Sequence, residues 1–148
     1  MQKGLWGTIL FRMREIRFGL LGFGRIGTGV VHLLRRNGRI ISRRLGARLV
    51  LGAVADIQPG PRKGAPLPRG IFTTNPKKVV DDPSLPIIVE LIGGTTDARE
   101  LVLRALKNKK HVVTANKALL ALHGEEIYKT SHKMGVDLGF EASVGGAI

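Results

Sequence analysis

The stretch Ile16–Val31, IRFGLLGFGRIGTGVV, decides the expected fold. An apolar run meets the glycine turn GFGRIG at 22–27, and a helical pattern opens directly after it. Strand, tight glycine turn and helix in this order hold the pyrophosphate of a dinucleotide. Gly22 permits the tight turn, Gly24 lets the bare backbone approach the phosphates, and Gly27 lets the helix pack closely on the strand. We therefore expect a dinucleotide site here, against the alternative of an accidental glycine turn in a chain with 20 glycines.

Length and composition point to one globular domain. The chain has 148 residues, 43% of them hydrophobic, which is enough to bury a core. Cysteine is absent, which excludes disulfides, thiolate metal sites and a cysteine nucleophile. No apolar stretch approaches the roughly 18 to 20 residues that span a bilayer, and no small-residue cleavage site follows the first residues. The cytoplasm is the expected location.

The charge is strongly basic and uneven. The formal net charge is +13, and residues 1–48 carry 11 of the 24 Lys and Arg against one acid, Glu15. Such a field attracts polyanions, and nucleic acid is the obvious candidate. No aromatic residue stands among the arginines at 35–48 to stack on bases. We therefore favour the alternative, a solvated helix face, and regard nucleic acid as an improbable partner.

Residues 1–13 do not fit the pattern that follows them. Met13 stands three residues before the first expected strand, so 1–12 are expected to be either the product of an upstream start codon or a loose, disordered tail that could seek a partner. The dinucleotide-binding domain is then expected over 14–148.

Alternating strands and helices define the fold class. A helix is expected from Arg25 to Asn37, where Asn37-Gly38 is a stop signal, with 40–46 as a basic continuation or a second short helix. An apolar face of this helix would turn to the sheet. It comprises Ile26, Val30, Leu33 and Leu34. Further strands are expected at 49–55, 87–92, 111–114 and 136–141, and helices at 76–81, 97–107 and 118–133. Five strands in this alternation predict a Rossmann-type, doubly wound α/β fold whose mostly parallel sheet has helices on both faces.

Asp56 ends the second expected strand, where the adenosine ribose 2′-hydroxyl would be bound. It follows Gly27 by 29 residues rather than the usual 20 or so, which requires an insertion near the first helix. A carboxylate here repels a 2′-phosphate and favours NAD. Arg62 and Lys63 in the next loop could still reach such a phosphate, so NADP stays open.

Two further turns lie at expected carboxyl ends of strands, the edge where cofactors bind in open α/β sheets. One contains Gly93, Gly94 and Thr95, and the other leads into Lys117. A lysine there can hold a substrate oxygen near a nicotinamide or transfer a proton. Its alternative is a solvated lysine at a helix start. The histidines have no metal-ligand spacing, and Ser143 lacks a nucleophile-elbow context.

Three segments resemble the N-terminal half of homoserine dehydrogenase: VELIGG at 89–94, KHVVTANKALLALHGEE at 110–126 and LGFEASVGGAI at 138–148. The resemblance covers 14–148. It implies an enzyme that reversibly reduces aspartate semialdehyde to homoserine with NAD(P)H, in threonine and methionine biosynthesis. It implies Lys117 as the lysine near nicotinamide and substrate. It also implies cofactor contacts from Gly22, Phe23, Gly24, Arg25, Ile26, Gly27, Asp56, Gly94, Thr95, Ala115, Asn116 and Lys117, and a monovalent cation such as Na⁺ held at Glu141, Val144, Gly146 and Ile148.

Two departures qualify what the resemblance implies. Ile57 follows Asp56 where NADP-using members often have an arginine, which favours NAD slightly. The chain also stops where the substrate and dimerisation domain of the family begins, so the proton-donating lysine and the homoserine-binding acids have no counterpart. We expect an incomplete enzyme that binds NAD(P) with little turnover and whose oligomeric state stays open. The alternatives are a nucleotide-binding module completed by a partner chain, and a polyanion-binding protein.

Overall fold

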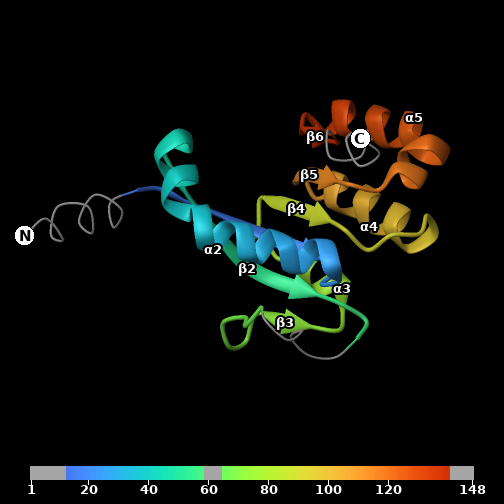
Figure 1. Cartoon of the computed structure of the whole chain (residues 1–148). Coiled ribbons are helices and arrows are strands. Elements are labelled where there is room, and N and C mark those ends of the chain that lie inside the picture. The colour runs from blue at the N-terminus through green and yellow to red at the C-terminus, as the bar shows by residue number, and fades with distance from the viewer. Residues whose placement is uncertain (1–12, 59–64, 141–148) are drawn as a thin grey trace, which may run out of the picture.

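A six-stranded sheet runs through the centre of the molecule, in the order β3-β2-β1-β4-β5-β6 with every neighbouring pair parallel. The computed structural model describes residues 13–58 and 65–140. Its elements follow the chain as β1 (Glu15–Leu21), α2 (Arg25–Leu45), β2 (Arg48–Ala55), β3 (Phe72–Thr73), α3 (Pro76–Asp81), β4 (Ile87–Glu90), α4 (Thr96–Lys107), β5 (His111–Thr114), α5 (Lys117–Met134) and β6 (Leu138–Gly139) (Figure 1). This strand order is that of the Rossmann fold, which confirms the predicted fold class.

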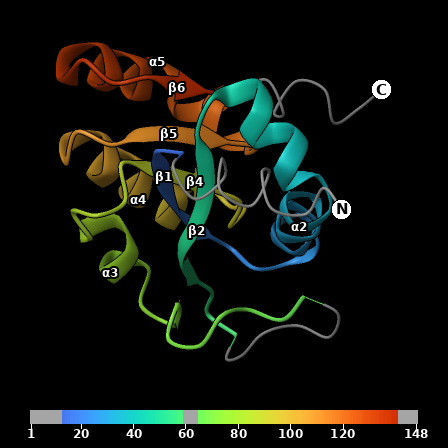
Figure 2. The same cartoon turned by 90° about the vertical axis from the view of Figure 1, so that its left-hand side faces the viewer.

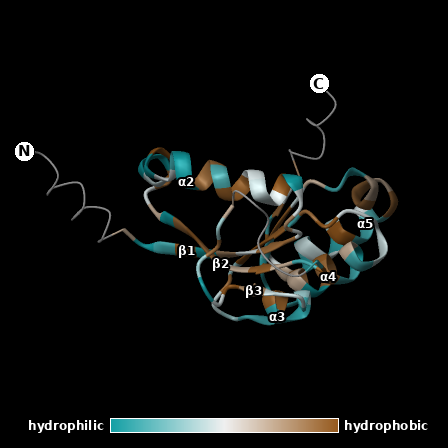
Figure 3. Cartoon of the chain, turned by 60° about the horizontal axis from the view of Figure 1, so that its bottom comes forward, coloured by the Kyte–Doolittle hydropathy of each residue, from teal (hydrophilic) through white to brown (hydrophobic). Residues whose placement is uncertain are grey.

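Helices cover both faces of the sheet (Figure 2). On one face, Val31 of α2 packs with Phe18 and Leu20 of β1 and Val54 of β2. On the other face, a larger cluster joins α3, α4 and α5 to Leu21, Ile88 and Val112 of the strands. Figure 3 shows the apolar segments of the sheet between α2 and the α3–α4 layer. A strand that is covered on both faces is expected to be apolar throughout, because all of its side chains are buried. Phe18, Leu20 and Leu21 of β1 agree with this, since all three are buried.

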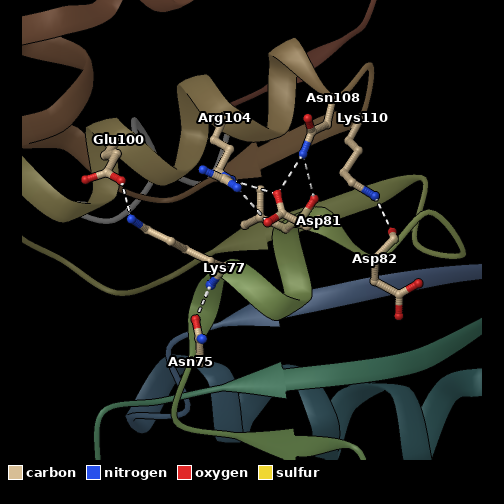
Figure 4. A network of polar contacts seen from close by, with 9 residues as sticks. Asn75, Lys77, Asp81, Asp82, Glu100, Arg104, Asn108 and Lys110 are labelled. Carbon is tan, nitrogen blue, oxygen red and sulfur yellow. Dashed lines mark hydrogen bonds and ion pairs between the residues drawn. The ribbon is translucent and has the colours of Figure 1, made fainter.

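Polar contacts tie α3 to α4 beside the sheet (Figure 4). Arg104 donates two hydrogen bonds of 2.7 Å from Nε and Nη2 to the two carboxylate oxygens of Asp81. Buried Lys110 donates from Nζ to the Asp82 and Leu85 carbonyls, at 2.5 and 2.7 Å. Burial lowers the pKa of Lys110, and Asp82 opposes that effect. Lys110, which precedes β5, therefore anchors the turn that leads into β4.

The first helix differs from its predicted form. It does not end at Asn37-Gly38 but continues to Leu45 and ends on Gly46, which has a φ of +69°. A single glycine inside a helix costs only about 1 kcal/mol relative to alanine, too little to stop a helix whose periodicity continues. The buried face is also different: Gly27, Val31 and Ser42 are buried, whereas Ile26 and Leu33 are 60% and 53% exposed. Of the predicted face, Leu34 does pack against the core cluster beside Val31, so the prediction is right for that residue and wrong for Ile26 and Leu33.

The sheet has one strand more than predicted over the described residues. Phe72–Thr73 pairs with Val54–Ala55 as β3, too short a segment to show a period in the sequence. The strand predicted over 87–92 ends at Glu90, and the last described strand is confined to Leu138–Gly139. Across residues 13–58 and 65–140, none of the helices has the length and apolar character required to cross a membrane.

Candidate dinucleotide site at the carboxyl edge of the sheet

The glycine turn lies where the strand order reverses, between the ends of β2 and β4. Gly22 N–H donates to the Ala55 carbonyl at 2.8 Å, and Leu91 N–H donates to the Leu21 carbonyl at 2.7 Å. Gly22 has a φ of +93°, and a Cβ there would collide with the Leu91 carbonyl. The turn is thus fixed by its neighbours on both sides at the switch point of the sheet, where open α/β sheets bind their ligands.

The other two glycines of the turn face different surroundings. A Cβ on Gly27 would collide with the Gly22 carbonyl, so the start of α2 approaches the turn as only glycine allows. A Cβ on Gly24 would meet no atom of residues 13–58 and 65–140 within 4 Å, so this backbone borders open space in the described part of the chain. Gly24 is the N-cap of α2, and the first turn of that helix carries no acid. These are the features of an anion site at a helix N-terminus.

A buried hydroxyl near this turn is also consistent with an anion bound at the start of α2. Among the described residues, Thr28 Oγ1 is the one buried side-chain polar atom that has no hydrogen-bond partner. Thr28 lies in the first turn of α2, where its backbone N–H donates to the Gly24 carbonyl. Buried polar atoms are nearly always satisfied, so an orphan here is consistent with a ligand that supplies oxygen atoms.

Asp56 stands on the opposite side of the glycine turn, directly after β2. Its Oδ2 accepts from Phe23 N–H at 2.6 Å, and its Oδ1 accepts from Gln58 N–H at 2.9 Å. The carboxylate is therefore oriented by two backbone groups, one of them in the glycine turn. Two carboxylate oxygens offer about four acceptor positions, so capacity remains for a hydroxyl of a ligand.

A cleft of about 230 Å³ opens between these groups. It brings Gly22, Gly24 and Asp56 together, as the sequence predicts. Its further lining residues are Ala55, Ile57, Gln58, Pro76, Leu91 and Ile92. Sequence reasoning did not single out Gln58, Pro76, Leu91 or Ile92, because they come from three separate turns, after β2, at the start of α3 and after β4. Only the parallel order of the strands brings those turns to one edge.

The turns after β4 and β5 form the rest of this edge. Thr95 is the N-cap of α4, and its side chain does not bond the helix. Asn116 is the N-cap of α5, where Oδ1 accepts from Leu119 N–H at 3.0 Å and Nδ2 donates to the Gly94 carbonyl at 2.6 Å. Lys117 is the first residue of α5 and is exposed, beside half-buried Ala115. The structure thus links the predicted Gly94 and Asn116 directly.

The remaining predicted residues are placed as follows. Phe23 is 1% exposed, and its side chain packs in the core, so only its backbone is available at the turn. Arg25 and Ile26 are exposed at the start of α2. Arg62, Lys63 and the predicted cation ligands Glu141, Val144, Gly146 and Ile148 lie outside the described residues. Within the described part of the chain, no three His, Cys, Asp or Glu side chains gather as a metal site would require.

Comparison with known proteins identifies the family. The family model for the NAD-binding domain of homoserine dehydrogenase matches residues 22–141. The homoserine dehydrogenase of Pseudomonas aeruginosa is 43% identical over 139 residues, which are 92% of this chain and 31% of that protein. The structure of the Thiobacillus denitrificans homoserine dehydrogenase is 46% identical, with a TM-score of 0.83 over 92% of this chain and 31% of that one. A hyperthermophilic archaeal homoserine dehydrogenase in complex with NADPH shares the fold, with a TM-score of 0.67 at 18% identity.

The chain spans about a third of the length of these bacterial relatives. The matched region contains the glycine turn, Asp56 and the turns after β4 and β5. The resemblance predicted from the three sequence segments is thereby confirmed. This chain belongs to the family of homoserine dehydrogenase NAD-binding domains.

Proposed function

We propose that the cleft at the carboxyl edge binds a nicotinamide dinucleotide, with the pyrophosphate at the glycine turn and the adenosine ribose at Asp56. The observation that carries this proposal is the open space beside Gly24, bordered by an uncapped helix N-terminus and by the Asp56 carboxylate. The orphan hydroxyl of Thr28 supports the same placement of the pyrophosphate.

NAD is the preferred cofactor under this proposal. The Asp56 carboxylate would accept a hydrogen bond from a ribose 2′-hydroxyl and repel a 2′-phosphate. Ile57, the next residue, is 84% exposed and offers no charge to a phosphate. A preference for NADP would require cations from residues 59–64, which include Arg62 and Lys63.

The nicotinamide half of the cofactor would lie along the turns after β4 and β5. Bound there, a nicotinamide accepts or supplies a hydride in the interconversion of homoserine and aspartate semialdehyde. Gly94, Thr95, Ala115 and Asn116 would border its ribose and ring. Lys117 would hold an oxygen of the substrate or move a proton at its Nζ. We further propose that residues 141–148 bind a monovalent cation such as Na⁺ through backbone carbonyl oxygens, because hard cations prefer oxygen ligands.

Turnover of homoserine is proposed to need more chain than these 148 residues, because the chain spans 31% of the bacterial relatives. That chain would be supplied as a covalent continuation or as a partner polypeptide, in the cytoplasm. A coupled assay with homoserine and NAD⁺ tests this point. Substantial NADH production by the 148-residue chain alone would contradict it.

Cofactor binding is tested with a matched pair of glycine variants. Gly24 and Gly29 both have open space where a Cβ would stand, and neither has a positive φ. Gly24→Ala places a methyl group where the phosphates approach, whereas Gly29→Ala lies outside the lining of the cleft. In calorimetric titration with NADH we expect binding to the unsubstituted chain and to Gly29→Ala, and at least about a tenfold loss for Gly24→Ala. Equal affinity of the two variants, or no binding by the unsubstituted chain, would refute the proposed site.

A further inference from the structure

A fully buried carboxylate lies beneath the proposed nicotinamide end of the site. Glu90 is the last residue of β4 and is 0% exposed. A buried carboxylate is costly unless hydrogen bonds compensate both of its oxygens. Here Oε1 accepts from Ile92 N–H at 2.8 Å, and Oε2 accepts from the Thr114 hydroxyl at 2.5 Å. Glu90 therefore binds the turn after its own strand and the end of the neighbouring strand β5 at once.

The contacts of Glu90 belong to a closed ring. Thr114 Oγ1, which donates to Glu90, accepts from Asn116 N–H at 3.0 Å. Asn116 Nδ2 donates to the Gly94 carbonyl at 2.6 Å. From Gly94 the backbone leads through Gly93 back to Ile92, which donates to Glu90. The ring therefore joins the turn that carries Gly94 and Thr95 to the turn that carries Asn116 and Lys117.

The turn after β4 is anchored to β1 at its first residue, where Leu91 N–H donates to the Leu21 carbonyl, but its glycines add no side-chain contacts. Gly93 and Gly94 both have positive φ values, +80° and +69°, and a Cβ on either would meet no atom within 4 Å. Two such glycines have no side chains to pack. Beyond Leu91, the turn is held by its hydrogen bonds to Glu90 and Asn116. A chain of hydrogen bonds in a low-dielectric interior is cooperative, so loss of one member loosens the others.

A carboxylate is not needed to fill this position. A leucine at the end of a strand buried on both faces would pack at no desolvation cost, since buried ionic groups are often matched by apolar ones. What a leucine could not do is accept from Ile92 N–H and Thr114 O–H together. The hydrogen bonds of Glu90 thus connect two turns, a role that an apolar core residue could not have.

We propose that Glu90, acting through Thr114, is a positioning residue that holds the two turns at the spacing required by the nicotinamide and its ribose. This inference rests on the proposed function and assigns these two residues no contact with the cofactor. It predicts that their loss selectively weakens binding of the nicotinamide half, while the glycine turn and Asp56 keep the adenosine and pyrophosphate half.

The test compares NADH with ADP, which retains the adenosine and the two phosphates but lacks both the nicotinamide and its ribose. Calorimetric dissociation constants for both are measured on the 148-residue chain and on Glu90→Gln, Thr114→Val and Thr114→Ser. Ser131→Ala is the control, because Ser131 is also buried and its hydroxyl donates to the Tyr128 carbonyl of its own helix. ADP binding shows that each variant is folded at the other half of the site.

We expect Glu90→Gln and Thr114→Val to bind NADH about tenfold more weakly, as loss of a buried hydrogen bond to a charged group implies, with ADP binding unchanged. Thr114→Ser restores the hydroxyl and should restore NADH affinity, and Ser131→Ala should change neither constant. A parallel loss for both ligands would overturn the inference, and so would equal affinity of the unsubstituted chain for NADH and ADP. Failure of that chain to bind either ligand would instead refute the proposed function.

Discussion

At the scale of single residues, Asp56 has a carboxylate that is oriented by backbone groups on both of its oxygens. Its two oxygens accept from backbone groups 33 residues and two residues away, so its orientation does not depend on a ligand. A preoriented carboxylate discriminates between a hydroxyl and a phosphate mainly by its charge. Neutralising the charge while keeping the shape therefore separates these two effects.

We predict that Asp56→Asn lowers the preference for NADH over NADPH. The amide removes the repulsion of the 2′-phosphate and also weakens one acceptor for the ribose hydroxyl. Each good charged hydrogen bond is worth roughly 1.5 to 3 kcal/mol, so NADH affinity should fall about tenfold or more. Calorimetric titration with both cofactors measures the ratio. The control is Asp137→Asn, which lies at the amino end of β6, and an unchanged ratio in Asp56→Asn would count against the assigned role.

At the scale of the elements, α2 is the clearest case in which long-range packing overrides a local stop signal. Gly38 lies in the interior of the helix, and a Cβ there would meet no atom within 4 Å. The helix ends instead at Gly46, where φ is +69° and the N–H donates to the Ser42 carbonyl. Gly38 therefore needs the helical conformation, which alanine also adopts, whereas Gly46 needs the left-handed conformation, which favours glycine.

Alanine substitution at these two positions should have opposite effects. Gly38→Ala should stabilise the protein by about 0.5 to 1 kcal/mol, because glycine in a helix interior loses more backbone entropy on folding. Gly46→Ala should destabilise it by roughly 1 kcal/mol or more, since the left-handed conformation strains any residue with a Cβ. Urea unfolding of both variants measures the free energies. A destabilised Gly38→Ala would mean that α2 does not continue through this position.

The contact between α3 and α4 should make stability depend on acid pH. The Arg104 guanidinium lowers the pKa of Asp81 below its ordinary value of 3.8, and the hydrogen bonds with Ser84 lower that of Asp82. A carboxyl group whose pKa is lower in the folded than in the unfolded state stabilises the fold above the unfolded value. That stabilisation is lost as the pH falls through the lowered value.

We therefore expect the free energy of unfolding to fall as the pH drops below about 4, and Asp81→Asn to show a shallower fall. The same variant should be less stable than the unsubstituted chain at neutral pH. Glu125→Gln on the exposed side of α5 serves as control and should leave the acid profile unchanged. Urea midpoints measured from acid to neutral pH test this pH dependence. Identical profiles for Asp81→Asn and the unsubstituted chain would contradict the role given to Asp81.

At the scale of the whole molecule, charge is the dominant feature. The formal net charge is +13, and α2 carries six arginines and no acid. These arginines are exposed along one helix rather than spread over a platform of aromatic residues. Such a field raises the local concentration of any anion and gives little selectivity among anions.

Salt dependence separates a dinucleotide site from a surface that binds nucleic acid. NADH presents two phosphates, so its affinity should weaken only shallowly as salt rises. A protein that contacts six or more phosphates of a duplex loses about a thousandfold or more between 50 and 200 mM salt. Titrations of NADH and of a short duplex over that range measure both slopes. Tight, steeply salt-dependent duplex binding together with weak NADH binding would favour the polyanion-binding alternative.

The amino-acid sequence by itself determined the elements whose signals are local. The glycine turn, the apolar strands and the capped helix Pro76–Asp81 follow from spacing and residue type, and the structure contains them. The family followed from three short segments. The extent of α2, the strand Phe72–Thr73 and the exposure of Ile26 did not, because propensity and periodicity are weak beside packing.

The sequence predicted that Gly22, Gly24 and Asp56 meet at the carboxyl edge, but only the tertiary structure decided the individual contacts there. Asp56 reaches the backbone of Phe23, and Glu90 reaches Thr114, across 33 and 24 positions of sequence. Such pairs depend on the order and register of parallel strands, which no local pattern encodes. In the sequence, Glu90 is a single polar residue within an apolar run. In the fold its carboxylate joins two turns, because neighbouring parallel strands end side by side.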